Sequence, residues 1–396
     1  MFNDSDLNDY IKDLKELVEK ESPSNNAKAI KKVIDFFVDK VLDFKLNANT
    51  IVKEYNKEAG PCLIITNAKD PLNEDLDLLM MAHMDTVYPI DTVKTGKNSN
   101  FIVDLDADTI KAPGVIDDKG PSLLGLYALK YIALPSFKFA FLLNSNEEVG
   151  TIGNDELIRQ LSAKAKYCIN LEAGRVSGAF VDQRLGLQNY KIILSNENKE
   201  PLIHSANQQT YNEANNTILE INNVLMSLRL LNSPYSNNFL NFKILSSDAN
   251  KRYAELKDIV IGVQARFLDE SFVPKVETAL ASLQTKIRNP KVLVSFEKTE
   301  FDRGLYLTKA SKEFKILVEK VGRKQGLKVA WESSFGGADS TFVVNQNCAT
   351  LDGFGPIGGD FHNAKEEYLK ISSVKERANL LIGVINEIIA SKKASF

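Results

Sequence analysis

The spacing of apolar residues predicts two amphipathic helices at the start of the chain. Apolar side chains recur at helical spacing over residues 7–18 and again over residues 30–42, with the Ser22-Pro23-Ser24 turn between them. Short apolar runs bounded by turns follow, which indicates buried strands at residues 62–66, 76–82, 138–143 and 167–171. A helical pattern at residues 121–134 separates two of these runs. This alternation predicts an α/β fold whose sheet is mixed and carries helices on both faces.

A different pattern over residues 187–298 predicts an inserted α+β domain. Four strands are expected there, at residues 188–194, 239–245, 258–268 and 291–296, with helices at 212–231 and 273–287. The α/β pattern then returns, with helices at 308–321 and 372–390 and strands at 327–331 and 348–351. We therefore expect a split domain, residues 1–186 and 299–396, interrupted by a second domain at 187–298.

Composition and charge exclude several classes of protein. The 396 residues are 44% hydrophobic and 26% charged, and Lys+Arg 49 against Asp+Glu 52 gives a net charge of −3. Such a balance offers no electrostatic reason to expect nucleic acid or an anionic membrane as a partner. The longest apolar run, residues 78–82, is far too short for a membrane span. An acidic start without an apolar core and three widely spaced cysteines in apolar runs predict a cytoplasmic protein with buried free thiols.

The sequence contains only three histidines, so any histidine chemistry must use His83, His204 or His362. His83 follows an apolar strand, and ligands collect at the carboxyl ends of strands in open α/β sheets. Asp85 lies two residues further on and is suited to accept the other ring N–H of a metal-bound histidine. The alternative is a strand-end histidine that is bonded locally.

Two pairs of adjacent carboxylates also suggest cation binding. Asp117 and Asp118 lie in a glycine-bounded loop, where a cation or the next helix N-terminus would offset their repulsion. Glu147 and Glu148 follow a predicted strand, so one carboxylate is available as a metal ligand and the other as a general base. Simple helix capping and a surface acidic turn are the respective alternatives.

Two further residues complete the set of candidate metal ligands. Glu172 follows the strand at 167–171, and His362 ends a glycine-rich loop, so five successive strand ends carry His, Asp or Glu. Two histidines and three carboxylates fit two zinc ions that share a carboxylate, with one acid left for proton transfer. Two dications and three carboxylates leave one positive charge, which favours activation of a water molecule for attack on a carbonyl.

These motifs, in this order, resemble those of the co-catalytic di-zinc peptidases and deacylases. That family includes bacterial glutamate carboxypeptidase, peptidase T, acetylornithine deacetylase and succinyl-diaminopimelate desuccinylase. The matching segments are His-Met-Asp-Thr-Val, Gly-Val-Ile-Asp-Asp-Lys-Gly, Asn-Glu-Glu-Val-Gly, Leu-Glu-Ala, Phe-Gly-Gly-Ala-Asp-Ser and Gly-Gly-Asp-Phe-His. The stretch from Gly336 through His362 to Tyr368 is most similar to the glutamate carboxypeptidase branch.

The resemblance implies a role for each donor. It implies two Zn²⁺ ions, with Co²⁺ or Mn²⁺ as possible substitutes. One ion would be held by His83, Asp117 and Glu172, and the other by Asp117, Glu148 and His362, so that Asp117 bridges. Glu147 would be the general base and Asp85 the partner of His83. A cis peptide bond is implied between Asp117 and Asp118.

The resemblance also implies that the inserted domain is a lid that forms a homodimer. His204 would then reach the active site of the other subunit. Substrate contacts are implied for Arg266, Arg303, Gly336 and Gly337. Ser205-Ala206 stands where the family usually has glycine soon after the lid histidine, a departure that bears on substrate preference.

The function expected from the sequence is zinc-dependent hydrolysis of an amide bond. The leading hypothesis is an exopeptidase of glutamate carboxypeptidase type that releases a C-terminal residue, with an acidic residue as one candidate, from a small peptide. An N-acyl-amino-acid deacylase or a di- or tripeptidase is the alternative within the same class, because each reaction is attack of water on an amide. A non-catalytic metal- or peptide-binding homologue is the alternative from another class, and retention of Glu147 argues against it.

Overall fold

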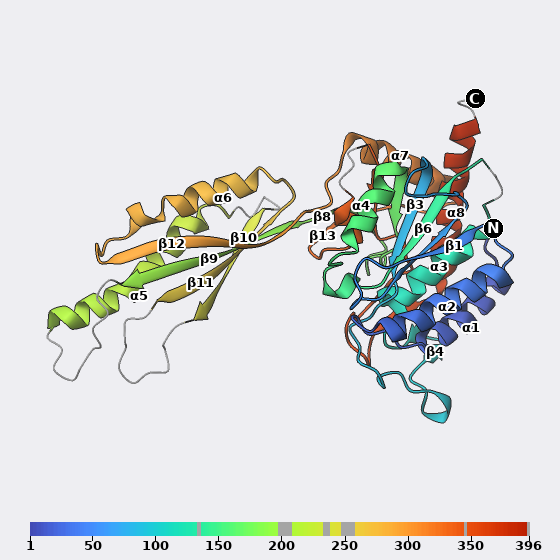
Figure 1. The fold of residues 1–396 in the computed structure, drawn as a ribbon, viewed down its shortest axis with the longest axis horizontal. Coiled ribbons are helices and arrows are strands. Elements are labelled where there is room, and N and C mark those ends of the chain that lie inside the picture. Colours follow the sequence, from blue (N-terminus) through green and yellow to red (C-terminus); the bar gives the residue numbers. More distant parts are fainter. Residues whose placement is uncertain (133–135, 197–207, 233–237, 247–257, 344–346, 394–396) are drawn as a thin grey trace. The chain divides into compact units, whose positions relative to one another are not determined.

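The computed structural model describes residues 1–132, 136–196, 208–232, 238–246, 258–343 and 347–393. The chain forms two compact units, each built from separate stretches of sequence (Figure 1). The larger unit comprises Met1–Gln183, Leu307–Ser334 and Ala338–Phe396. The smaller unit comprises Arg184–Tyr306 together with the three-residue stretch Phe335–Gly337.

A mixed sheet of six strands forms the centre of the larger unit, in the order β1-β2-β6-β3-β7-β14. Its strands are β1 (Asn49–Lys53), β2 (Cys62–Thr66), β3 (Leu76–His83), β6 (Phe139–Asn144), β7 (Ala165–Asn170) and β14 (Ala349–Leu351). Neighbours among β6, β3, β7 and β14 run parallel, whereas β2 is antiparallel to both of its neighbours. The parallel strands therefore direct their carboxyl ends toward one edge of the sheet.

Helices cover both faces of this sheet, as predicted. Leu78 and Met80 of β3 point into one core, and Leu79 and Met81 point into the other. The first core is completed by α1 (Asp4–Val18), α2 (Ala27–Asp43), α3 (Gly120–Leu129), α7 (Lys309–Lys324) and α8 (Ile371–Lys393). The second includes α4 (Asp155–Lys164). Burial on both faces explains why these strands read as continuous apolar runs in the sequence.

Two small sheets complete the larger unit. One has the order β15-β16-β5-β4, from Gly358–Gly359, Tyr368–Lys370, Thr109–Lys111 and Ile102–Asp104. The other pairs β8 (Phe180–Arg184), which ends on the first residue of the smaller unit, with β13 (Trp331–Ser334). Short helical turns lie at η1 (Gly96–Asn98), η2 (Val115–Lys119), η3 (Glu147–Val149) and η5 (Asp339–Phe342).

The smaller unit is an antiparallel sheet with helices on one face. The strand order is β10-β11-β9-β12, from Phe239–Ser246, Ile259–Phe267, Gly186–Asn196 and Val292–Asp302. The core of this unit joins these strands to α5 (Gln208–Arg229), α6 (Phe272–Ala281) and the turn η4 (Leu283–Lys286). Along β11, buried residues alternate with partly exposed ones, so only one face of the sheet is covered.

Several predicted elements are wrong in extent or place. The strand predicted at residues 327–331 is a loop, and β13 begins only at Trp331. The reason is the end of α7, where Gly326 has φ +74 and the Leu327 amide donates to the Gly322 carbonyl, closing the helix rather than joining a sheet. The predicted helices at 121–134 and 273–287 end earlier, at Leu129 and Ala281.

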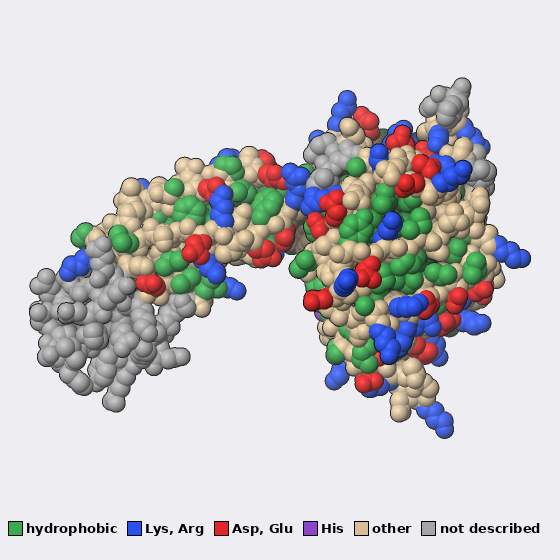
Figure 2. All heavy atoms as spheres, viewed as in Figure 1, with side chains coloured by type: hydrophobic (Ala, Val, Ile, Leu, Met, Phe, Trp, Pro, Cys, Tyr) green, Lys and Arg blue, Asp and Glu red, His purple; other side chains and the backbone are tan. Residues whose placement is uncertain are grey.

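The described residues contain no helix that is both long and apolar enough to cross a membrane. Basic and acidic side chains are interspersed over the face of the larger unit that Figure 2 shows. Cys62, Cys168 and Cys348 are buried and unbonded, which confirms the prediction of buried free thiols. Burial raises the pKa of the Cys62 thiol to about 12.

Candidate metal centre

His83 is the last residue of β3, and its ring is fixed by Asp85. The Nδ1–H donates to the Asp85 carbonyl oxygen at 3.1 Å, and Nδ1 lies 3.3 Å from Asp85 Oδ1. Both side chains are buried. Because Nδ1 is held in this way, Nε2 is the ring atom directed toward the other acids.

The two oxygens of Asp117 face two different histidines. Oδ1 lies 3.1 Å from Nε2 of His83, and Oδ2 lies 3.1 Å from Nε2 of His362. Glu172 Oε1 is 3.9 Å from His83 Nε2, and Glu148 Oε2 is 3.2 Å from His362 Nε2. Each histidine thus faces a different oxygen of Asp117, and each lies near a different glutamate.

The donor atoms are close enough to share cations. Two groups have ligand atoms that all lie within 4.8 Å of one another: His83, Asp117 and Glu148, and His83, Glu147 and Glu172. Both acids of η3 therefore come close to His83. Among the described residues, Oε1 of Glu148 is buried without a hydrogen-bond partner, as expected for an atom that would otherwise face a cation. The chemistry and spacing of the donors fit divalent metal ions.

The electrostatics of the site also favour cations. Burial opposes a charge on His83, yet hydrogen bonds to Asp117 and Asp85 raise its pKa well above the usual value. The hydrogen bond to Asp117 raises the pKa of His362 to about 9. Burial, reinforced by Asp117, raises the pKa of Glu148 to about 7. Excess negative charge thus retains protons here, and binding of metal ions would release them.

Asp85 also holds the turn that carries the two adjacent glutamates. Its Oδ1 accepts the Glu147 amide at 3.0 Å, and its Oδ2 accepts the Glu148 amide at 3.2 Å. The Ser24 hydroxyl donates to the same Oδ2 at 2.7 Å. One buried carboxylate therefore sets the position of both the His83 ring and η3. Burial, followed by the field of neighbouring acids, raises the pKa of Glu147 well above its usual value.

The loop that carries Asp117 is anchored on the side facing α1. The peptide bond between Asp117 and Asp118 is cis, as the resemblance implied. Lys119 is buried, and its ammonium donates to the carbonyls of Leu17 at 3.2 Å and Lys20 at 2.7 Å, at the end of α1.

The expectation of five equivalent strand ends is corrected by the structure. His83, the η3 glutamates and Glu172 do follow the parallel strands β3, β6 and β7 of the central sheet. Asp117 lies instead in a turn after β5, and His362 in the loop between β15 and β16. These two donors come from loops next to the small antiparallel sheet, so a second sheet helps to build the site.

The predicted substrate-binding residues belong to the smaller unit, except that His204 lies outside the described residues. The Arg303 guanidinium pairs with Glu270, with Nε 2.8 Å from Oε1. Arg266 donates to the Phe335 carbonyl at 3.1 Å. The carbonyls of the two predicted glycines, Gly336 and Gly337, accept hydrogen bonds from Arg184, a residue that the sequence analysis missed.

Sequence reasoning also missed buried polar residues that support the donors. The Asp339 carboxylate accepts the Thr151 hydroxyl and the Asn144 amide, which ties η5 to the segment after β6. Asp339 belongs to a motif that the resemblance included, and that motif was the available signal. Glu367 is a second case: it lies in the matching stretch that runs to Tyr368, but an acidic, lysine-containing run is typical of a solvent-exposed segment, and no role was assigned to it.

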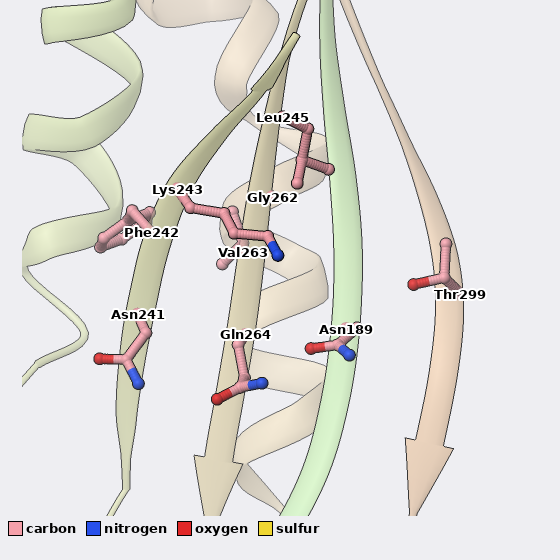
Figure 3. Close-up of a pocket in the computed structure, with 9 residues that line it drawn as sticks. All are labelled: Asn189, Asn241, Phe242, Lys243, Leu245, Gly262, Val263, Gln264 and Thr299. Carbon is pink, nitrogen blue, oxygen red and sulfur yellow. The ribbon is translucent and has the colours of Figure 1, made fainter.

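A hollow of about 340 Å³ lies on the open face of the smaller unit's sheet (Figure 3). Asn241, Gln264 and Asn189 occupy directly opposed positions on β10, β11 and β9. Gly262 has no side chain, and the Leu245 side chain packs over it, while Lys243 is the residue opposite Gly262 on β10. No histidine, cysteine or acid is among the described residues that line the hollow, so its chemistry differs from that of the metal centre.

Comparisons with known proteins agree with this geometry. A sequence model of "Peptidase family M20/M25/M40" matches residues 79–387. Carboxypeptidase G2 from Pseudomonas sp. (strain RS-16) is 23% identical over 328 residues, covering 80% of this chain and 75% of that protein.

Two solved structures share the fold along nearly their whole lengths. Aminopeptidase PepT from Bacillus cereus has a TM-score of 0.74 at 18% identity, covering 97% of this chain and 99% of that one. A tripeptidase from Staphylococcus aureus has a TM-score of 0.72 at 20% identity, covering 98% and 99%. Because the family model spans most of the chain and the donor set is intact, the protein belongs to peptidase family M20/M25/M40 and is a metallopeptidase.

Proposed function

We propose that the protein is a cytoplasmic di-zinc exopeptidase of glutamate carboxypeptidase type that releases a C-terminal residue, with an acidic residue as one candidate, from a small peptide. The observation that carries the proposal is the position of Asp117 between His83 and His362, each with its own glutamate. The sequence similarity to carboxypeptidase G2 supports the C-terminal direction of cleavage. Free cysteines that stay unbonded support a reducing compartment.

The residues of the chain divide the chemistry among them. In the proposed site, His83, Asp117 and Glu172 would hold one ion, and Asp117, Glu148 and His362 would hold the other. When bound, the ions would polarise the amide carbonyl and lower the pKa of a water molecule. Glu147 is the general base: it takes a proton from the attacking water and delivers it to the leaving nitrogen. Asp85 keeps both His83 and Glu147 in place through the hydrogen bonds described above.

The second candidate is an aminopeptidase or tripeptidase, favoured by the two solved structures whose folds match nearly the whole chain. The two candidates differ in which end of the peptide must be free. The test is kcat/KM of the zinc-loaded protein on two matched peptides, one with a blocked N-terminus and a free C-terminal carboxylate, the other with a free N-terminus and a C-terminal amide.

We expect cleavage of the first peptide and little of the second. The reverse result would favour the aminopeptidase, and a requirement for both free ends would favour the tripeptidase. A panel of N-acyl amino acids in the same assay tests the deacylase alternative. Protein that binds metal but cleaves none of these compounds would be a non-catalytic homologue.

We also propose that the smaller unit is a lid that forms a homodimer. At the edge strand β10, Ile244 and Leu245 are exposed, as are Leu219 and Met226 of α5 and Leu230 directly after it. An uncovered strand edge beside apolar side chains is a surface that a twofold partner covers. Sedimentation should show a dimer, and Ile244→Lys should weaken it.

The role of His204 in the other subunit is a separate proposal with its own test. A His204→Ala protein and a Glu147→Gln protein, mixed under conditions of subunit exchange, should regain activity. Absence of any recovery would contradict action of His204 across the dimer.

A further inference from the structure

Glu367 is a buried carboxylate close to the metal centre to which no role has been assigned. It immediately precedes β16, and its side chain is directed at the loop that carries Asp117. Only 1% of the residue is exposed to solvent. A buried acid requires hydrogen-bond donors, so its partners indicate what it does.

Four donors converge on this carboxylate. Oε1 accepts the backbone N–H of Ile116 at 3.0 Å and that of Asp117 at 3.2 Å. Oε2 accepts the backbone N–H of Gly114 at 3.1 Å and the hydroxyl of Tyr88 at 2.5 Å. An ionised carboxylate has acceptor sites for all four, whereas a glutamine amide would place an NH₂ group against two of the donors.

The adjacent acid provides an internal contrast. Glu366 pairs with Lys111, its Oε2 2.7 Å from Nζ, and both side chains are largely exposed, 54% and 42%. The two neighbouring glutamates therefore have the same charge but different tasks. One is a solvated surface pair, which contributes little. The other accepts three backbone N–H groups of the loop that contains Asp117.

The small antiparallel sheet explains how residues so far apart in sequence come together. Strand β16 pairs with β5, and the Ala112 amide continues the ladder by donating to the Glu367 carbonyl. Glu367 follows His362 in the same loop region, five positions later in the sequence. It therefore links the segment that supplies His362 to the segment that supplies Asp117.

We propose that Glu367 is a positioning residue that directs the Asp117 carboxylate so that its two oxygens reach the two metal positions together. The inference rests on the proposed two-metal function of the site. Lys119 fixes the loop on the side of α1, and Glu367 fixes it on the side of β16. Glu367 touches neither substrate nor metal in this role, because it acts through the backbone of Asp117.

The test uses full-length protein loaded with Mn²⁺ or Co²⁺ and compares Glu367→Gln with Glu366→Gln. Exchange coupling between the two ions, measured by electron paramagnetic resonance, depends on the ligands that bridge them and on their separation, so it responds to a change in the bridging carboxylate. Chelator competition gives the affinity for the second ion, and peptide hydrolysis gives kcat and KM separately.

We expect Glu367→Gln to lower the affinity for the second ion about 10- to 100-fold, the usual range for residues that orient metal ligands. The exchange coupling between the two ions should be reduced or abolished. The fall in activity should appear in kcat, with KM changed less than about threefold. Glu366→Gln should match the wild type in all three measurements. Wild-type coupling and affinity in folded Glu367→Gln would overturn the inference.

Tyr88→Phe covers the case in which Glu367→Gln fails to fold, because it removes one donor and keeps the carboxylate. It should shift the coupling in the same direction by a smaller amount, and an unchanged signal would contradict the inference. If the proposed function is wrong, the same measurements give a different result. Wild-type protein with two coupled ions that cleaves no peptide would refute the function, and loss of coupling in Glu367→Gln would still support the inference.

Discussion

Strands β3 and β11 have similar lengths, eight and nine residues, but opposite environments. Strand β3 is buried on both faces and ends at His83. Strand β11 is buried on one face only, and residues such as Gln264 lie on the open face. The difference is that the strand covered on both faces ends in a buried donor of the metal centre, His83, although His362 of the same centre lies in an exposed loop. The uncovered sheet, by contrast, carries amide and lysine side chains around a hollow.

The two strands also differ in what lies beyond their ends. At the end of β3, Asp85 links His83 to the glutamate turn through buried hydrogen bonds. In the smaller unit, Arg303 pairs with Glu270 at a site where both side chains are more than a third exposed. Substitutions should therefore act strongly and locally in the first region and weakly in the second.

The largest expected effect is that of Glu147→Gln. Glutamine keeps the shape but cannot accept the proton, so kcat should fall about 10²- to 10⁴-fold while metal content stays unchanged. The matched control is Glu156→Gln on the exposed side of α4, which should leave kcat unchanged. Loss of metal from Glu147→Gln would show that the roles of Glu147 and Glu148 have been exchanged.

A pair of leucines tests the difference in burial. Leu79→Ala in β3 should lower the free energy of unfolding by about 2–5 kcal/mol, because it leaves a cavity between two covered faces. Leu293→Ala in β12, where the side chain is 47% exposed, should cost less than about 1 kcal/mol. Urea denaturation of each variant gives the comparison, and equal costs would contradict it.

The next prediction concerns Arg303, whose role in substrate binding remains a prediction. A guanidinium suits a substrate carboxylate, so Arg303→Ala should lower the ratio of kcat/KM for C-terminal acids to that for matched amides. Glu270→Ala, which frees the arginine, should leave the preference for acids intact. An unchanged ratio in Arg303→Ala would make the residue structural.

The smallest effect concerns thiol reactivity and needs no assay of function. Burial raises the pKa of the Cys62 thiol to about 12, so the thiol stays protonated at any pH below that value. At pH 8 an alkylating reagent should therefore modify the folded protein very slowly, and all three cysteines only after unfolding. A Thr299→Cys variant, on the open face of the smaller unit, should react quickly under the same conditions. Rapid labelling of the native wild type would contradict this picture of the larger unit.

Much of the fold could be predicted from the sequence because strands and helices differ in the spacing of their apolar residues. Strands buried on both faces gave short, continuous apolar runs, and β11 gave strict alternation. The sequence failed where local chemistry competed with that pattern. Residues 327–330 look like a strand, but the Leu327 amide is used to close α7. Helix α4 was missed although Leu157, Ile158 and Leu161 have helical spacing.

For the site, the sequence by itself pointed to His83, to His362 and to the acidic pair Asp117-Asp118, because histidine is rare in this chain and paired acids are costly without a cation. The choice of Asp117 as the shared ligand came from the family resemblance. The tertiary structure alone decided that these donors meet, since β16 must pair with β5 to bring the His362 loop to the Asp117 loop. It also decided that Glu367 is buried while Glu366 is not. Neighbouring glutamates carry the same local signal, and only the packing of distant segments determines which one is removed from water.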